Sequence, residues 1–232
     1  MKQIIAMGGG GFSQEPENPL LDTYILQQSH SARPKVCFIP TASGDAEGYI
    51  QGFYKAFSAY DCVPSHLSLF QNTPKDLEDY LLDKDILYVG GGNTKNMLLL
   101  WKAWKVDQYI RKAWENDVVL AGLSAGSICW FQEGVTDSIP GELTRLECLG
   151  FLKGSSCPHY DEEVDRRSSY HRLLQEQKIG NGIAMDDGVA VHYQEDQIFK
   201  VISSRALAKA YQVSYVNQQV TETEITPIFL GN

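Results

Sequence analysis

The stretch VVLAGLSAGSICW, residues 118–130, is the most informative part of the sequence, because its pattern is that of a buried strand followed by a turn of small residues and a helix. Val118 to Ala121 form a continuous apolar run, which is typical of a strand buried on both faces of a parallel sheet. The turn Gly122-Leu123-Ser124-Ala125-Gly126 follows, and an amphipathic segment begins directly after it. This order predicts a strand, a sharp turn and a helix, with Ser124 at the tip of the strand.

The same alternation of apolar runs and helical segments occurs throughout the first half of the chain. Strands are predicted at 3–7, 35–43, 85–94 and 118–123, and helical patterns at 19–29, 46–60 and 106–116. Such an alternation predicts an α/β protein with a mostly parallel sheet. After Ile179 the pattern changes. Two short strands around Asp187-Gly188 indicate a hairpin, and further strands are expected at 197–204 and 221–230.

Composition and charge exclude several classes of protein. The chain has 232 residues and a net charge of −9, and its Lys and Arg residues form no basic patch, so we expect neither nucleic-acid nor membrane binding. The five cysteines include no CxxC pair, and no metal site is expected. The N-terminus lacks the long apolar region of a signal peptide, which predicts a cytoplasmic protein. No break in composition divides the chain, so residues 1–232 are predicted to form one domain.

Three predicted strands end in small residues, namely GGGG at 8–11, TASG at 41–44 and GGGNT at 90–94. Ligands of open parallel sheets bind where such loops converge, outside the carboxyl ends of the strands. The first loop is not a dinucleotide fingerprint, because position 14 is Gln where GxGxxG spacing needs a glycine. No GxxxxGK[ST] phosphate loop is present either.

Ser124 lies in a GxSxG pattern at a strand-to-helix junction, which is the context that a nucleophile elbow requires. The flanking glycines remove side chains that would clash in a sharp turn. The same turn leaves the amide of Ala125 free at a helix N-terminus, where an oxyanion would form. A helix N-cap serine after a tight turn is the alternative interpretation.

GLSAGS at 122–127 together with YVGGGNT at 88–94 resembles the peptidase E family, which also includes the cyanophycinases. A Pro-His dipeptide at 158–159 and the acidic turn GIAMDDG at 182–188 follow in the same order as in the family. The resemblance implies a serine peptidase that acts on small peptides without a metal ion or organic cofactor. It also implies a three-layer αβα fold with a mostly parallel sheet, like the flavodoxin-like fold of the class I glutamine amidotransferases.

A serine hydroxyl needs a neighbouring base, and five histidines are available. His30 and His66 lie in segments predicted to be at the surface, and His171 is expected on a solvated helix face. His159 in SSCPHYDEE and His192 in VAVHYQED remain. Because the peptidase E family carries its catalytic histidine in a Pro-His dipeptide at this place, the resemblance selects His159 as general base and acid.

The third catalytic residue orients the imidazole. The resemblance places an acidic residue on the turn 182–188, and the flanking glycines align it with Asp187 rather than Asp186. Asp187-Gly188 is also ordinary turn chemistry without a catalytic duty. Asp137 in VTDSIP is a further candidate.

The resemblance also indicates which groups meet the substrate. The amide of Gly92 is expected to complete the oxyanion hole with that of Ala125. Family members cleave after N-terminal Asp or within aspartyl polymers, and Arg167 is the best match to an arginine implicated in substrate recognition. The compact acidic segment DEEVD at 161–165 departs from the family pattern. Its charge either disfavours an acidic substrate or attracts the amino terminus of a dipeptide.

Two other functions stay open at this point. An α/β-hydrolase esterase would use His192 as its base, although it needs an HGGG-type loop and VGGGNT has no histidine. A ligand-binding protein without turnover would keep the fold and leave Ser124 unreactive. The sequence also leaves a homodimer open.

Overall fold

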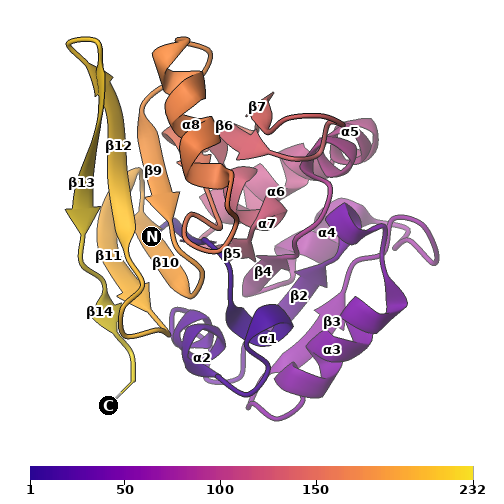
Figure 1. Cartoon of the computed structure of the whole chain (residues 1–232). Helices are drawn as coiled ribbons and strands as arrows, with labels where there is room; N and C mark the ends of the chain where they lie inside the picture. Colours follow the sequence, from indigo (N-terminus) through magenta and orange to yellow (C-terminus); the bar gives the residue numbers. More distant parts are fainter. Residues whose placement is uncertain (232) are drawn as a thin grey trace.

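The computed structural model describes residues 1–231 and arranges its strands in two sheets (Figure 1). The larger sheet has the order β14-β11-β10-β1-β5-β4-β2-β3. Its strands are β1 (Gln3–Met7), β2 (Lys35–Ile39), β3 (Val63–His66), β4 (Ile86–Val89), β5 (Val119–Leu123), β10 (Val189–Gln194), β11 (Gln197–Ser203) and β14 (Ile228–Phe229). The strands β1 to β5 run parallel, as their apolar runs predict, whereas β10 runs antiparallel to both β1 and β11.

Helices cover both faces of these parallel strands. Ile5 and Met7 of β1 belong to a core that includes α1 to α3, and Ile4 and Ala6 belong to a core that includes α4 to α6. Side chains alternate between the two faces of a strand, so a strand covered on both faces has to be apolar throughout. The helices, with one 3-10 turn, are α1 (Gly11–Gln14), α2 (Leu20–Leu26), η1 (Thr41–Ser43), α3 (Glu47–Phe57), α4 (Leu77–Leu82), α5 (Thr94–Trp104), α6 (Val106–Glu115), α7 (Ala125–Ile128) and α8 (Arg166–Gln175).

The second half of the chain builds a separate sheet of six strands, in the order β13-β12-β9-β8-β6-β7. The prediction of one mostly parallel sheet therefore describes only part of the fold. Strands such as FQEGVT and LKGSSC mix apolar, polar and glycine residues, so they form no continuous apolar run that the sequence analysis could detect. These strands are β6 (Phe131–Thr136), β7 (Thr144–Glu147), β8 (Leu152–Cys157), β9 (Gly182–Met185), β12 (Ala210–Val216) and β13 (Gln219–Ile225).

The predicted hairpin around Asp187-Gly188 is wrong. Met185 of β9 pairs with Ala210 in the six-stranded sheet, whereas Ala190 of β10 pairs with Met7 in the eight-stranded sheet. The Asp-Gly turn signal is local and does not determine which partner each flanking strand finds. The connection between β9 and β10 consequently crosses from one sheet to the other, close to the end of β1.

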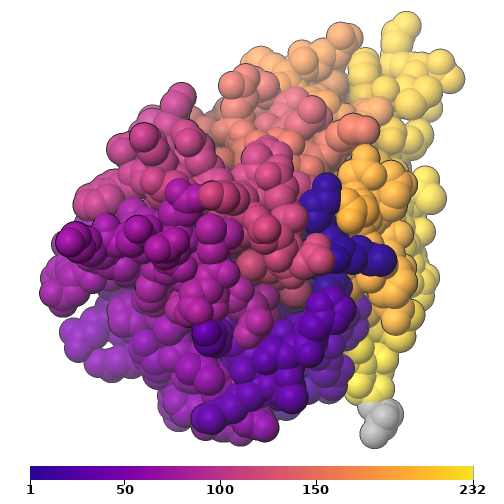
Figure 2. All heavy atoms as spheres, turned by 180° about the vertical axis from the view of Figure 1, so that it is seen from behind, coloured from indigo at the N-terminus to yellow at the C-terminus, as the bar shows by residue number. Residues whose placement is uncertain are grey.

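The two sheets share core residues. The core that contains α4 to α6 continues to Ile183 of β9 and Ala210 of β12. Seen from behind, the N-terminal half and the orange and yellow C-terminal strands form one continuous surface (Figure 2). No helix within residues 1–231 has the length and apolar character needed to cross a membrane.

Candidate active site

Ser124 occupies the sharp turn between β5 and α7. Its φ of 53° and ψ of −115° are a strained combination for a residue with a side chain. A Cβ on Gly122 would lie 2.2 Å from the carbonyl oxygen of Gly126, and a Cβ on Gly126 would lie 2.2 Å from that of Val89. Both glycines are therefore needed for α7 to pack closely against the sheet and present Ser124 at its edge.

The loop after β4 lies beside this serine. A Cβ on Gly91 would be 3.7 Å from Ser124 Oγ, and Gly92 has a φ of 135° that favours glycine. The amide of Gly91 donates to Tyr49 Oη at 3.2 Å. By contrast, the amides of Gly92 and Ala125 meet no acceptor within residues 1–231. Two backbone donors are thus free in the two loops that meet at the serine.

His159 lies on the connection between β8 and α8 and reaches the same edge of the sheet. Its amide donates to the carbonyl oxygen of Gly8 at 3.3 Å, and the amide of Ser124 donates to that of Met7 at 3.4 Å. Consecutive residues at the end of β1 therefore anchor both segments. Within the described chain no hydrogen bond joins Ser124 Oγ to the imidazole, a contact that often tightens only when substrate binds.

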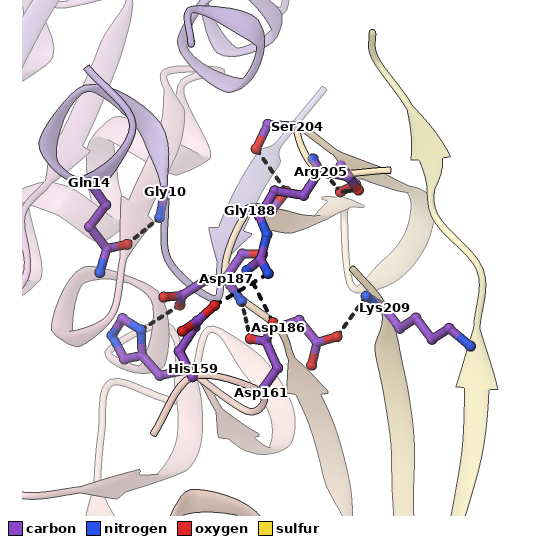
Figure 3. Close-up of polar contacts among 12 residues, drawn as sticks. Gly10, Gln14, His159, Asp161, Asp186, Asp187, Gly188, Ser204, Arg205 and Lys209 are labelled. Atoms are coloured by element: carbon purple, nitrogen blue, oxygen red, sulfur yellow. Dashed lines mark hydrogen bonds and ion pairs between the residues drawn. The ribbon is translucent and has the colours of Figure 1, made fainter. Parts of the chain in front are cut away.

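The imidazole of His159 contacts Asp187. Its Nδ1 lies 2.6 Å from Asp187 Oδ1, and the His159 side chain is almost completely buried (Figure 3). The loop of Gly9 makes this approach possible, because a Cβ on Gly9 would lie 2.1 Å from the same carboxylate oxygen. The arrangement joins an imidazole to a carboxylate through Nδ1 and leaves Nε2 for a second partner.

The two other candidate carboxylates have different partners. Asp186 Oδ2 accepts from the amide of Lys209 at 2.8 Å, and burial raises the pKa of Asp186 to about 6. Asp137 is largely exposed, and its carboxylate lies 3.9 Å from the Arg166 guanidinium. Of the three candidates that the sequence left open, Asp187 is the one that meets His159.

His192 is a buried core residue. Its Nδ1 lies 2.8 Å from Tyr24 Oη and its Nε2 lies 3.0 Å from Gln3 Oε1, and the side chain is fully buried. Burial lowers the pKa of His192 to about 4. Because both ring nitrogens are occupied and the residue pairs with Ile5 in the middle of β1, His192 is not placed to act as the base of an esterase.

Arg167 has a carboxylate partner that the sequence analysis did not consider. Its guanidinium donates through Nε and Nη2 to both oxygens of Glu222 on β13, with Nε 3.0 Å from Oε1. The guanidinium also lies over the rings of Tyr160 and Tyr211, 5.2 Å from each centroid. His171, expected on a solvated face, is half-buried and its Nε2 lies 2.6 Å from Glu222. Glu222 escaped the sequence analysis because it lies in the polar strand QVTETEI, without a motif.

The acidic segment after His159 is largely paired within the chain. Asp161 and Glu162 lie 3.0 and 3.3 Å from the Arg205 guanidinium, and Glu163 lies 2.5 Å from that of Arg166. Arg205 follows β11 without any recognisable motif, so sequence reasoning missed it. Within residues 1–231, no group of three or more His, Cys, Asp or Glu side chains is arranged to hold a metal ion.

A serine on a strained strand-to-helix turn, together with a histidine–aspartate pair at the same sheet edge, is the arrangement of an α/β serine hydrolase. Residues 4–201 match the model of Peptidase family S51. The chain belongs to this family of serine peptidases, as the resemblance to peptidase E implied.

Two relatives of the chain carry the word peptidase in their names. The chain is 56% identical over 231 residues to the uncharacterized peptidase YgaJ of Bacillus subtilis, and the match covers 100% of both chains. It is 28% identical over 134 residues to the uncharacterized peptidase Lmo0363 of Listeria monocytogenes, which covers 54% of this chain and 65% of that protein. Both similarities agree with the family assignment.

Two solved structures share the fold. A peptidase from an acI-B1 Actinobacterium has a TM-score of 0.71 at 16% identity, covering 98% of this chain and 95% of that one. A putative peptidase E protein from Listeria monocytogenes has a TM-score of 0.64 at 19% identity, covering 88% of this chain and 98% of that one. At these identities the likeness concerns the fold alone.

Proposed function

We propose that this chain hydrolyses peptide bonds in small peptides, above all dipeptides. Ser124 is the nucleophile, His159 the general base and acid, and Asp187 the residue that orients the imidazole. The observation that carries this proposal is the 2.6 Å contact between His159 Nδ1 and Asp187 Oδ1, at the sheet edge where the strained Ser124 lies. The turn of Ser124 also corresponds to the place of the nucleophilic cysteine in the class I glutamine amidotransferases, the fold that the resemblance implies.

The proposed steps follow from this geometry. With the Nδ1 proton donated to Asp187, His159 Nε2 accepts the proton of Ser124 Oγ as the oxygen attacks the scissile carbonyl carbon. The free amides of Gly92 and Ala125 donate to the oxyanion of the tetrahedral intermediate. His159 then protonates the leaving amine, and a water molecule hydrolyses the acyl-enzyme by the same proton path.

The proposal for the first residue of the substrate concerns Arg167. The family resemblance implies cleavage after an N-terminal Asp, whose carboxylate would make a bidentate contact with a guanidinium. Glu222 already makes this contact with Arg167. We propose that an aspartyl side chain binds Arg167 only by replacing Glu222. Dipeptides with a neutral first residue should therefore be cleaved with a kcat/KM similar to that of Asp-X dipeptides.

A panel of dipeptides with varied first residues tests the proposed chemistry. Ser124→Ala and His159→Gln should each lower kcat/KM by at least about 1,000-fold on every cleaved dipeptide, because each removes a group that acts on the reacting atoms. The control is His66→Gln, because His66 lies on β3, outside the site, and is a partly buried histidine whose Nδ1 lies 2.8 Å from Tyr54 Oη. Its kcat/KM should stay within about threefold of the wild-type value.

The competing esterase is distinguished in the same series. An esterase with His192 as its base would cleave nitrophenyl esters and lose this activity in His192→Gln while keeping it in His159→Gln. That pattern, or dipeptide cleavage that survives His159→Gln, contradicts the proposal.

A further inference from the structure

Asp187 lies on the connection 186–188, which crosses between the two sheets, so no strand ladder holds its own peptide groups. The neighbouring Gly188 is held by the backbone, through an amide that donates to the carbonyl oxygen of Gly9 at 3.2 Å. The amide and carbonyl of Asp187 are held by side chains instead. The position of the carboxylate therefore depends on residues outside the connection.

Asp161 and Arg205 supply these contacts. Asp161 Oδ1 accepts from the amide of Asp187 at 2.8 Å, and Arg205 Nη1 donates to the carbonyl oxygen of Asp187 at 3.1 Å. Arg205 Nη1 also lies 3.0 Å from Asp161 Oδ2. Asp161, Arg205 and the backbone of Asp187 therefore form a closed ring of polar contacts. Figure 3 shows Asp187 between His159 on one side and Gly188 with Arg205 on the other.

The ring joins three segments that are distant in sequence. Asp161 follows His159 by two residues, and Arg205 lies just beyond β11. The side chain of Arg205 runs directly over Gly188, where a Cβ would lie 2.7 Å from Arg205 Cδ. Glu162, 3.3 Å from the guanidinium, adds a second carboxylate to the pair. A displacement of Arg205 would therefore leave Asp187 less firmly held beside His159. It would also leave the carboxylates of Asp161 and Glu162 without their cationic partner.

Resting on the roles proposed for His159 and Asp187, we propose that Asp161 and Arg205 are positioning residues for the reaction. They hold the backbone of Asp187 at both its N–H and its C=O, so that the carboxylate stays in contact with His159 Nδ1. Neither side chain touches the reacting atoms. Their effect passes through the orientation of the imidazole, whose misplacement by about 1 Å can cost about 100-fold in rate.

Arg205→Gln is the direct test, and Arg145→Gln is its matched control. The two arginine side chains are 38% and 36% exposed, and each pairs with two carboxylates, which for Arg145 are those of Glu133 and Glu147 on β6 and β7. The first readout is the far-downfield proton NMR signal of His159 Nδ1–H bonded to Asp187, assigned by its absence in His159→Gln. We expect the signal to weaken or shift in Arg205→Gln and to stay unchanged in Arg145→Gln.

The second readout separates kcat from KM on the best dipeptide. Arg205→Gln should lower kcat by about 10- to 100-fold with KM within about threefold, because the substrate contacts are intact while the base is misoriented. Asp161→Asn keeps an oxygen that can accept from the amide of Asp187 and removes the charge that Arg205 pairs with. It should therefore lower kcat by less than Arg205→Gln does.

A wild-type NMR signal in Arg205→Gln, or a kcat equal to that of Arg145→Gln, overturns the positioning role. Equal losses of kcat and of melting temperature in both arginine variants would also overturn it, because they would show general destabilisation. The NMR signal reports the ring without any turnover. If the wild-type protein cleaves no dipeptide, while the NMR signal still weakens or shifts in Arg205→Gln, the proposed function is contradicted. The positioning of Asp187 by Arg205 is then still supported.

Discussion

Gly9→Ala tests whether the histidine–aspartate pair depends on a glycine that has no side chain to contribute. The new methyl group would lie 2.1 Å from Asp187 Oδ1, whereas ordinary contact begins at 3.4 Å. The methyl group would also lie 2.5 Å from Gln14 Oε1. The backbone of Gly9 is anchored at the end of β1 and accepts from the amide of Gly188, so the ends of the Asp187 and Gln14 side chains are the groups that move.

The size of the effect follows from this overlap. The carboxylate oxygen has to move by about 1 Å, which lengthens the 2.6 Å contact to His159 Nδ1 beyond hydrogen-bond distance. A hydrogen bond to a charged group is worth about 1.5–3 kcal/mol, so kcat/KM should fall about 10- to 100-fold. The fold should persist, because the overlap involves the movable ends of side chains.

Steady-state kinetics on a cleaved dipeptide, together with a melting temperature, provide the assay. Gly52→Ala is the matched control, since a Cβ there meets nothing within 4 Å and the position lies within α3. Its kcat/KM should equal the wild-type value. If Gly9→Ala also retains wild-type kcat/KM, catalysis does not depend on the 2.6 Å contact between Asp187 and His159.

Three further predictions concern charge and pH. Burial raises the pKa of Asp22, beneath the first glycine loop and bonded to Tyr88 Oη at 3.1 Å, from 3.8 to about 7. As pH rises, Asp22 ionises in the unfolded chain before it ionises in the folded one, so the wild-type protein loses stability. The free energy of unfolding should fall by about 4 kcal/mol between pH 4 and pH 7 in wild type but not in Asp22→Asn, measured by urea unfolding. The contribution of His192 to stability changes with pH in the opposite direction. Its pKa falls from 6.5 to about 4, so the unfolded chain binds the extra proton, and wild type should lose about 3 kcal/mol between pH 6.5 and pH 4, a slope that His192→Gln removes. Glu222→Gln frees the Arg167 guanidinium and should raise kcat/KM for Asp-X over Ala-X dipeptides by about tenfold, whereas an unchanged ratio would exclude Arg167 from substrate recognition.

The sequence predicted the parts of the fold and site that depend on local patterns. The apolar run before Ser124 and the two glycines around it report burial on both faces and a close backbone approach, and both are found in the structure. The Pro-His dipeptide selects His159 only through the family resemblance, and in the structure the amide of His159 donates to the carbonyl oxygen of Gly8, directly after β1. These features are visible in sequence because each is a property of a few consecutive residues.

The features that escaped prediction are set by contacts between distant segments. Asp187 and Gly188 form a turn in sequence, yet their flanking strands pair in different sheets, which no local signal reveals. Arg205 and Glu222 find their partners across long stretches of chain, and neither lies in a motif. Strands with mixed polarity such as β8 depend on the sheet that accepts them, so the six-stranded sheet could not be read from apolar runs.

Covalent labelling with a fluorophosphonate probe, followed by peptide mass spectrometry, shows whether Ser124 is the nucleophile. We expect a single adduct on Ser124 that is lost in Ser124→Ala and forms much more slowly in His159→Gln, because the probe needs an activated serine beside free oxyanion donors. Labelling in Ser127→Ala, which changes the neighbouring buried serine on α7, should stay at the wild-type rate. An unlabelled wild-type protein, or an adduct on another residue, would contradict the assignment of Ser124 as the nucleophile.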